Sequence, residues 1–186
     1  MYFTPLALAA LLSLTIAAPV ASEEKRAPTT IKPIVISEYY VKTGRIAYNL
    51  QHGHIYKTSP NNGDDRTTLV TFDIPASAAG KTCSIGLDLD GPTSTLTGSK
   101  LVDVYTSLAP APGNRNAWGP GNQRNLAYGR LSVVDGGSAT WKSDVPAPGK
   151  AFACPPKGRW AIELVGVYDD DEVVWDKAMS GPYVRF

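Results

Sequence analysis

The chain has 186 residues, of which 43% are hydrophobic, and this is enough apolar material for one domain of ordinary size. Eighteen basic residues against seventeen acidic ones give a formal net charge of +1, which excludes binding driven mainly by a strong electrostatic field, as to nucleic acid or an anionic membrane. The 17 glycines and 15 prolines favour short elements joined by turns over long helices.

The first predicted element is an apolar run from Leu6 to Ala18, too short to span a bilayer and followed by small residues. This pattern is typical of a secretory signal peptide. Lys25 and Arg26 then form a dibasic pair that resembles the sites of kexin-type processing proteases. We therefore expect a signal peptide over residues 1–17, a propeptide over 18–26 and a single secreted domain over 27–186, with no membrane span. The predicted location is extracellular or in the cell wall.

Strand-like runs alternate with turn residues through the rest of the chain, which predicts an all-β fold. The expected architecture is a two-layer antiparallel β-sandwich of about nine or ten strands with one disulfide. The main predicted strands cover 67–74, 83–89, 101–108, 126–134, 159–168 and 172–177, and shorter ones cover 34–41, 45–48, 151–153 and 182–185.

Local patterns predict where several of these strands lie. Alternation of apolar and polar residues in 67–74 and 83–89 indicates strands that bury one face. The continuous apolar run within 159–168 indicates a central strand that is covered on both sides. The Asp-Gly-Gly run at 135–137 supplies residues that tolerate positive φ, so it predicts a tight hairpin turn between neighbouring strands.

Cys83 and Cys154 are the only two cysteines, and an even number in a secreted chain predicts that they form a disulfide. Cys83 is in phase with Ile85 and Leu87 on the predicted core face, so the bridge should be buried, beside Phe152. We expect it to lock the two layers together. A redox pair or a zinc site is the alternative, but the CxxC spacing typical of both is absent.

His52 and His54 form the only histidine cluster. On a strand their rings would project from the same face, where Asp64 or Asp65 could complete a metal site. Two ligands without a fixed third seldom hold zinc, so the sequence favours a polar loop over a metal site.

Asp169, Asp170, Asp171 and Glu172 are four adjacent acids that could offer oxygens to calcium. They lack the alternating spacing of a dedicated calcium loop, so a solvated hairpin turn is the favoured interpretation. We predict no bound metal and no cofactor.

Asp73, Asp88 and Glu163 occupy outward phases of three predicted strands, and a glycosidase needs two such carboxylates at a defined distance. Outward acids on half-buried sheets are more often solubilising residues. The chain also lacks the Gly-x-Ser-x-Gly and His-Glu-x-x-His motifs. We therefore assign no catalytic residues and predict that the protein is not an enzyme.

The segment from Pro110 to Asn125 is too long for a plain connection, and it combines Arg115, Trp118 and Arg124 with Gly, Asn and Pro. Arginine and tryptophan anchor interfaces and stack on sugar rings, so these three residues are the predicted ligand-binding surface. The alternative is an insertion whose Trp118 folds back onto the sandwich.

Six short segments form a common pattern: TFDIP (71–75), GKTCSIGLDL (80–89), GSK with LVDVYTSL (98–108), FACP (152–155), the apolar strand that ends at Tyr168, and GPYV (181–184). Over residues 67–186 this pattern resembles the C-terminal domain of the fungal But-two (ubiquitin-3-binding protein) family. The resemblance implies a β-rich domain of the kind common in secreted or cell-surface proteins of filamentous fungi, and it brings no catalytic residues. The family's name comes from an intracellular member that binds components of ubiquitin-like modifier pathways, which conflicts with the predicted signal peptide.

Together these features predict a secreted, non-enzymatic fungal β-sandwich that acts as an extracellular or wall-associated interaction protein. Its expected partner is a cell-wall carbohydrate or an extracellular protein, and not nucleic acid. Two alternatives are a small extracellular hydrolase of cell-wall polysaccharide and an adaptor that binds components of ubiquitin-like conjugation.

Overall fold

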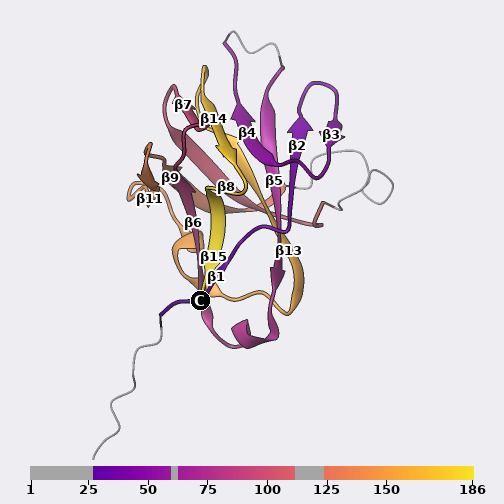
Figure 1. Cartoon of the computed structure of the whole chain (residues 1–186), viewed down its shortest axis with the longest axis vertical. Helices are drawn as coiled ribbons and strands as arrows, with labels where there is room; N and C mark the ends of the chain where they lie inside the picture. Colours follow the sequence, from indigo (N-terminus) through magenta and orange to yellow (C-terminus); the bar gives the residue numbers. More distant parts are fainter. Residues whose placement is uncertain (1–26, 60–62, 112–123) are drawn as a thin grey trace, which may run out of the picture.

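The computed structural model describes residues 27–59, 63–111 and 124–186, and within them the protein is an antiparallel β-sandwich (Figure 1). Nine strands in this part have five residues or more, in agreement with the expected nine or ten, and six others have two or three. No helix in these ranges is long and apolar enough to cross a membrane. The elements are β1 (Thr30–Ile31), β2 (Val35–Tyr40), β3 (Arg45–Ala47), β4 (His52–Tyr56), β5 (Arg66–Ile74), η1 (Ala76–Ala78), β6 (Thr82–Leu89), β7 (Thr95–Thr97), β8 (Leu101–Ser107), β9 (Arg124–Ser132), β10 (Gly137–Ser138), β11 (Thr140–Trp141), η2 (Pro148–Lys150), β12 (Phe152–Ala153), β13 (Gly158–Gly166), β14 (Glu172–Asp176) and β15 (Gly181–Arg185).

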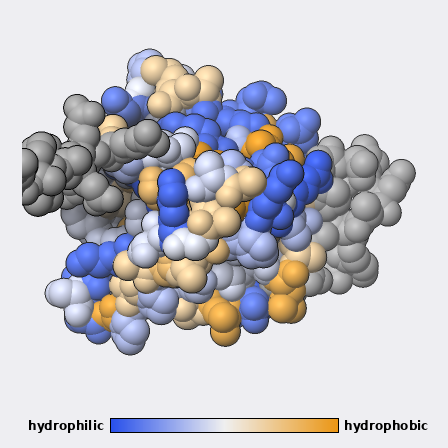
Figure 2. Space-filling model, turned by 90° about the horizontal axis from the view of Figure 1, so that it is seen from below, coloured by the Kyte–Doolittle hydropathy of each residue, from blue (hydrophilic) through white to orange (hydrophobic). Residues whose placement is uncertain are grey.

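Two sheets make up the sandwich. The larger has the order β11-β9-β8-β13-β5-β4-β14-β7, with β2 also paired to β5 and β3 paired to β2. The smaller has the order β1-β15-β6-β10, with β12 also paired to β6. The core lies between them, because buried residues of both sheets, such as Phe72 and Ile162 from the larger and Leu87 and Val184 from the smaller, form one apolar cluster. At the end of the molecule shown in Figure 2, hydrophobic residues occur in small groups between hydrophilic ones.

Two strand predictions are confirmed by burial and pairing. In β6 buried and partly exposed residues alternate, with Ile85 and Leu87 in the core. Strand β13 lies between β5 and β8, and its residues 161–164 are all buried. Periodicity therefore identified both the half-buried strand and the central strand.

The prediction that β5 buries only one face is wrong. Thr67, Thr68 and Thr71 on this strand are as buried as its apolar residues. On the side away from the sandwich core, Leu69 of β5 packs against Ala111, in a second small apolar cluster. Alternation correctly gave the side that faces the main core, but it could not show that a distant segment covers the other side.

The hairpin predicted around 135–137 is present, but its turn is not the tight one expected. The strands it was to join do pair, with Leu131 of β9 opposite Trp141 of β11. Between them, however, the chain crosses to the other layer, where Gly137 of β10 pairs with Leu89 of β6. Of the two glycines only Gly136 has a positive φ, 69°. The connection from β9 through β10 to β11 therefore needs only one of the two glycines in the left-handed conformation.

The Cys83–Cys154 disulfide is present, and Cys83 is buried. Phe152 lies directly opposite Cys83, as expected. The expectation that the bridge joins the two layers is wrong, because β12 pairs with β6 within the smaller sheet. Cys154 lies between β12 of the smaller sheet and β13, which begins at Gly158 in the larger sheet. The disulfide therefore anchors the start of the connection between the two sheets.

Trp175 of β14 is fully buried and fills a slot that requires glycine on strand β4. A Cβ atom added at Gly53 would overlap the six-membered ring of Trp175, and one added at Gly181 would overlap its pyrrole edge. Because protein interiors are close-packed, neither the ring nor the strands around it can move aside without loss of other contacts. The His-Gly-His sequence therefore serves packing at its middle position.

Replacing Gly53 by alanine should lower the free energy of unfolding by about 2 kcal/mol, because the added methyl group overpacks the core against Trp175. Gly137→Ala is the matched control, since a Cβ there meets only a Val134 methyl group at 3.2 Å. Urea denaturation of both variants tests this. Equal stability of the two variants would show that the Trp175 slot is not tight.

Candidate binding face

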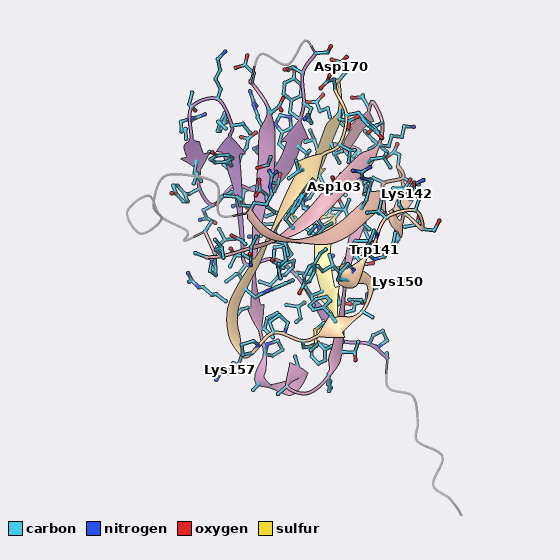
Figure 3. The ribbon with its side chains drawn as sticks, turned by 180° about the vertical axis from the view of Figure 1, so that it is seen from behind. Asp103, Trp141, Lys142, Lys150, Lys157 and Asp170 are labelled. Carbon is cyan, nitrogen blue, oxygen red and sulfur yellow. A yellow bond between two sulfur atoms is a disulfide. The ribbon has the colours of Figure 1, made fainter. Side chains whose placement is uncertain are left out.

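The outer face of the larger sheet carries polar and aromatic side chains on its central strands. In β8 the buried residues Val102 and Val104 point into the core, so Asp103 and Tyr105 point outward. Glu163 of β13 lies directly across from Tyr105. Figure 3, which shows the molecule from behind, places Asp103 in the middle of this face.

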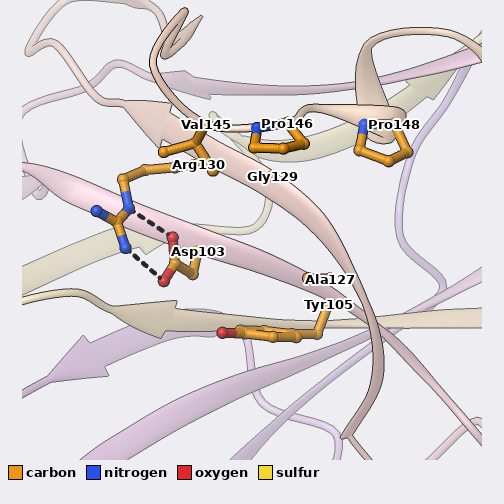
Figure 4. A pocket seen from close by; sticks show the side chains of 8 residues that line it. All are labelled: Asp103, Tyr105, Ala127, Gly129, Arg130, Val145, Pro146 and Pro148. Atoms are coloured by element: carbon orange, nitrogen blue, oxygen red, sulfur yellow. Dashed lines mark hydrogen bonds and ion pairs between the residues drawn. The ribbon is translucent and has the colours of Figure 1, made fainter.

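A hollow of about 280 Å³ lies on this face, lined by residues of β8, β9 and the segment 145–148 (Figure 4). On one side the guanidinium group of Arg130 donates two hydrogen bonds to the carboxylate of Asp103, at 2.7 and 3.0 Å. These bonds raise the pKa of Arg130 above its ordinary value, so its guanidinium group stays charged. The lining residues are Asp103, Tyr105, Ala127, Gly129, Arg130, Val145, Pro146 and Pro148.

The opposite wall of the hollow is the segment before η2. It approaches β9 so closely that a Cβ added at Gly129 would lie 2.8 Å from the Cα of Ala147. Gly129 also has a φ of 119°, at an irregularity in the pairing of β8 with β9. Glycine therefore allows both the backbone bend and the close approach that shape this wall.

Glu163 is buried, and the prediction that it is a solubilising surface acid is wrong. Its carboxylate accepts hydrogen bonds from the guanidinium group of Arg124, at 2.8 and 3.2 Å, and from the hydroxyl of Thr67 at 2.7 Å. Burial alone would lower the pKa of Arg124, but the bonds to Glu163 hold it above its ordinary value. Glu163 does point away from the core, and Arg124 covers it.

Arg124 also lies over the ring of Tyr105, with its guanidinium carbon 4.8 Å from the ring centre. This stack separates the hollow beside Asp103 from a second hollow of about 210 Å³ on the other side of Arg124. The two hollows therefore lie side by side along the face. The second is lined by Tyr39, Val41, Lys57, Asp65, Arg66, Thr67, Arg124 and Val165.

The predicted ligand-binding surface is only partly within the described residues. Arg115 and Trp118 lie outside them. Arg124 is the first residue of β9, where it binds Glu163 and borders the second hollow. Asp103, Tyr105 and Arg130 were not among the predicted site residues, although the alternation in LVDVYTSL places the first two on an outward face.

The interpretation of His52-Gly-His54 as a polar loop is wrong, because these residues begin strand β4. His52 is exposed, whereas the ring of His54 lies between two carboxylates, those of Glu38 and Glu172. Asp64 pairs with Lys42 and Asp65 with Lys57, whereas the two ring nitrogens of His54 face glutamates. Among residues 27–59, 63–111 and 124–186 there is no group of three side chains arranged to hold a metal ion.

The acids at 169–172 do not form a solvated hairpin turn, since β13 and β14 pair with other strands. Asp171 is buried, and its carboxylate accepts hydrogen bonds from the backbone and hydroxyl of Ser99 and from the backbone of Tyr168. Asp170 accepts a hydrogen bond from the backbone N–H of Ser59, and Asp169 makes no side-chain hydrogen bond or ion pair with the described residues. The turn ties β13 and β14 to the start of β8, and Figure 3 shows Asp170 at the upper end of the molecule, far from Asp103.

The three outward acids are not brought together. Glu163 lies opposite Leu69, and Asp73 is four residues further along β5, which corresponds to about 13 Å at 3.3 Å per residue. Glycosidase carboxylates are about 5 to 9.5 Å apart. Asp88 lies on β6 of the smaller sheet, where it accepts a hydrogen bond from Ser138.

Comparison with models of protein families gives a match. A family model described as the ubiquitin 3 binding protein But2 C-terminal domain matches residues 47–178, more than half of the chain. The match begins in β3, before the segments on which the resemblance was based, and ends before β15 with its Gly-Pro-Tyr-Val segment. A search of curated proteins gave no match. The extent of the family match shows that the chain belongs to the But2 family.

Proposed function

We propose that the protein is a secreted, non-enzymatic binding protein that takes a cell-wall carbohydrate on the outer face of its larger sheet. The observation that carries this proposal is the hollow in which the ring of Tyr105 lies near the Asp103–Arg130 pair. The predicted signal peptide supports export, and the Cys83–Cys154 disulfide suits an oxidising compartment.

The chemistry of the hollow suits a sugar. A sugar ring offers an apolar face to an aromatic side chain and hydroxyl groups to planar polar side chains. Tyr105 supplies the first kind of contact. Asp103 and Arg130 supply the second, and because they hold each other in place, little side-chain freedom would be lost on binding. Because the hollow is open to solvent, a few sugar units of a long polysaccharide could bind in it while the rest of the polymer extends beyond it.

The same contacts favour binding over catalysis. A glycosidase needs one carboxyl group that can give up a proton and another that can attack or activate water. On this face Asp103 accepts two hydrogen bonds from Arg130, and Glu163 accepts two from Arg124. Both carboxylates are therefore engaged by a guanidinium group, and neither is left free to attack a sugar carbon or to activate water.

Protein purified from the culture medium of cells that express the full chain should adsorb to insoluble chitin or β-glucan, without release of reducing sugar. Arg130→Ala should weaken adsorption by about tenfold, because it removes one planar polar group and frees the other to move. Arg185→Ala is the matched control. Arg185 also lies over a tyrosine ring, that of Tyr183, but on the smaller sheet. Adsorption isotherms for the three proteins measure the difference.

Several results would contradict the proposal. These are absence of the protein from the medium, no adsorption to either polysaccharide, equal adsorption by Arg130→Ala and Arg185→Ala, or release of reducing sugar. The family description names binding to ubiquitin 3, so immobilised ubiquitin belongs in the same experiment. Retention on ubiquitin that is lost in Arg130→Ala would assign the face to a protein partner instead.

A further inference from the structure

His54 is placed so that each of its ring nitrogens faces a carboxylate oxygen. Nδ1 lies 3.0 Å from Oε1 of Glu38, and Nε2 lies 3.1 Å from Oε1 of Glu172. The side chain of Glu38 is 5% exposed and that of His54 16%. The three residues come from β2, β4 and β14, so the ring connects strands that are not all neighbours in the sheet.

A neutral imidazole cannot satisfy both contacts. It carries one N–H donor, and its other nitrogen has a lone pair, which is repelled by a carboxylate oxygen at 3.0 Å. The doubly protonated imidazolium has a donor on each nitrogen and can bond to both glutamates. Histidine is also the side chain whose charge changes between about pH 5 and 8. Only the protonated ring can therefore donate a hydrogen bond to both glutamates.

The charges around the ring also favour its protonated form, although one neighbour opposes it. Arg66 of β5 lies 3.5 Å from Oε1 of Glu38 and 3.4 Å from Nδ1 of His54. Because a guanidinium group can only donate, a neutral ring would accept this bond on Nδ1 and donate to Glu172 from Nε2. Tyr40 of β2 donates a hydrogen bond to the other oxygen of Glu38, at 2.7 Å, and the ring of Tyr56 lies 5.8 Å from the imidazole. With one arginine and two glutamates, the group has a net charge of −1 when the imidazole is neutral and zero when it is protonated.

The pKa of Glu38 fits this arrangement. Burial alone would raise it, but hydrogen bonds from His54 and Tyr40 and the charges of His54 and Arg66 hold it below its ordinary value. Because the folded-state pKa is lowered, the stability that this carboxylate contributes is present above about pH 4.5, its ordinary pKa, and is lost as the pH falls through the folded value. Glu38 therefore stays charged over the range in which a histidine gains its proton.

The position of His54 gives this group a structural role. Strand β4 pairs with β5 at one residue pair only, Tyr56 with Arg66, so this is a thin junction in the larger sheet. Next to it, the backbone N–H of His54 donates to Oγ1 of Thr68, and that hydroxyl donates to the carbonyl of His54. The His54 ring ties the same point to β2 on one side and to β14 on the other.

We propose that the contact of His54 with Glu38 and Glu172 is an acid-strengthened latch, which fastens β4 and β14 to β2 when the imidazole is protonated and loosens when it is neutral. The latch makes the protein more stable in mildly acidic surroundings than at neutral or alkaline pH. It acts at the β4–β5 junction and does not depend on the ligand proposed for the outer face.

Thermal unfolding of the full chain between pH 4.5 and 8 tests the latch. The wild-type Tm should rise by about 3 °C or more from pH 8 to pH 5.5, as expected for about one added ion pair in a domain of this size. His52→Gln should show the same rise, because the exposed side chain of His52 makes no hydrogen bond or ion pair with the described residues. His54→Gln should lose it. If His54→Gln keeps the rise, or if the wild type shows none, the proposal is wrong.

A second variant and a local measurement cover the case in which His54→Gln does not fold. Glu172→Gln changes a side chain that is 35% exposed, and it should reduce the rise in Tm, since one of the two carboxylates is lost. In wild-type protein the protection of the His54 amide from hydrogen exchange, corrected for the intrinsic rate, should be several-fold greater at pH 5.5 than at pH 7.5. Amides of β13 should show no such change. Equal changes in β4 and β13 would show a global effect and overturn the latch.

Discussion

Replacing both Cys83 and Cys154 by serine should lower the free energy of unfolding by about 4 kcal/mol. The two cysteines are 71 residues apart, and the chain-entropy model assigns a bridge of this separation about that value, mostly through constraint of the unfolded chain. The loss is a large share of the net stability of a typical domain. Buried Cys83 would also place a serine hydroxyl in the core, which adds to the cost.

Denaturation of wild-type protein with and without a reducing agent provides the comparison for this variant. The double serine variant should match reduced wild-type protein to within about 1 kcal/mol, which separates the effect of the bridge from that of the hydroxyl groups. A loss of less than about 1 kcal/mol in both measurements would mean that pairing of β12 with β6 alone holds this end of the smaller sheet.

Arg124→Ala should lower the free energy of unfolding by about 3 kcal/mol, although Arg124 lies at the surface end of β9. The loss arises at Glu163, whose side chain is 1% exposed and would keep only the hydrogen bond from Thr67. Removing one partner of a buried ion pair costs about 3 to 5 kcal/mol. The lower end applies because the Arg124 side chain is 30% exposed. Chemical denaturation at neutral pH measures this loss.

The double variant Arg124→Ala/Glu163→Gln should be more stable than Arg124→Ala alone. A neutral amide removes the uncompensated charge and can still accept the bond from Thr67. Arg185→Ala, which removes a stacked surface arginine without a buried acid beneath it, should cost about 0.5 kcal/mol or less. If Glu163→Gln makes the Arg124→Ala variant less stable, the buried charge is not the cause.

The parts of the fold that sequence predicts well are those set by local periodicity. Strand β6 and the burial of Cys83 follow from a two-residue period, and the central place of β13 follows from a continuous apolar run. Both patterns arise from the face that a residue presents within its own strand. Two cysteines in a chain that is expected to be exported allow a single intramolecular pairing, so the disulfide could also be predicted from the sequence.

The features that sequence missed depend on a partner far along the chain. Glu163 is buried because Arg124 covers it from 39 residues away, and Asp171 because Ser99 binds it across 72 residues. His54 and Glu172 are 118 residues apart. Periodicity gives the direction of each side chain but not what lies above it, so an acid covered by a distant residue has the same local pattern as a solvated one.

The crossing of the chain from β9 to β10 and back to β11 has a consequence for how the protein unfolds. Because Gly137 pairs with Leu89 in one layer and Trp141 with Leu131 in the other, a segment of a few residues belongs to both sheets at once. Neither sheet can come apart without pulling this segment out of the other. The two layers should therefore melt as one cooperative unit, with no stable half-folded state that keeps a single sheet.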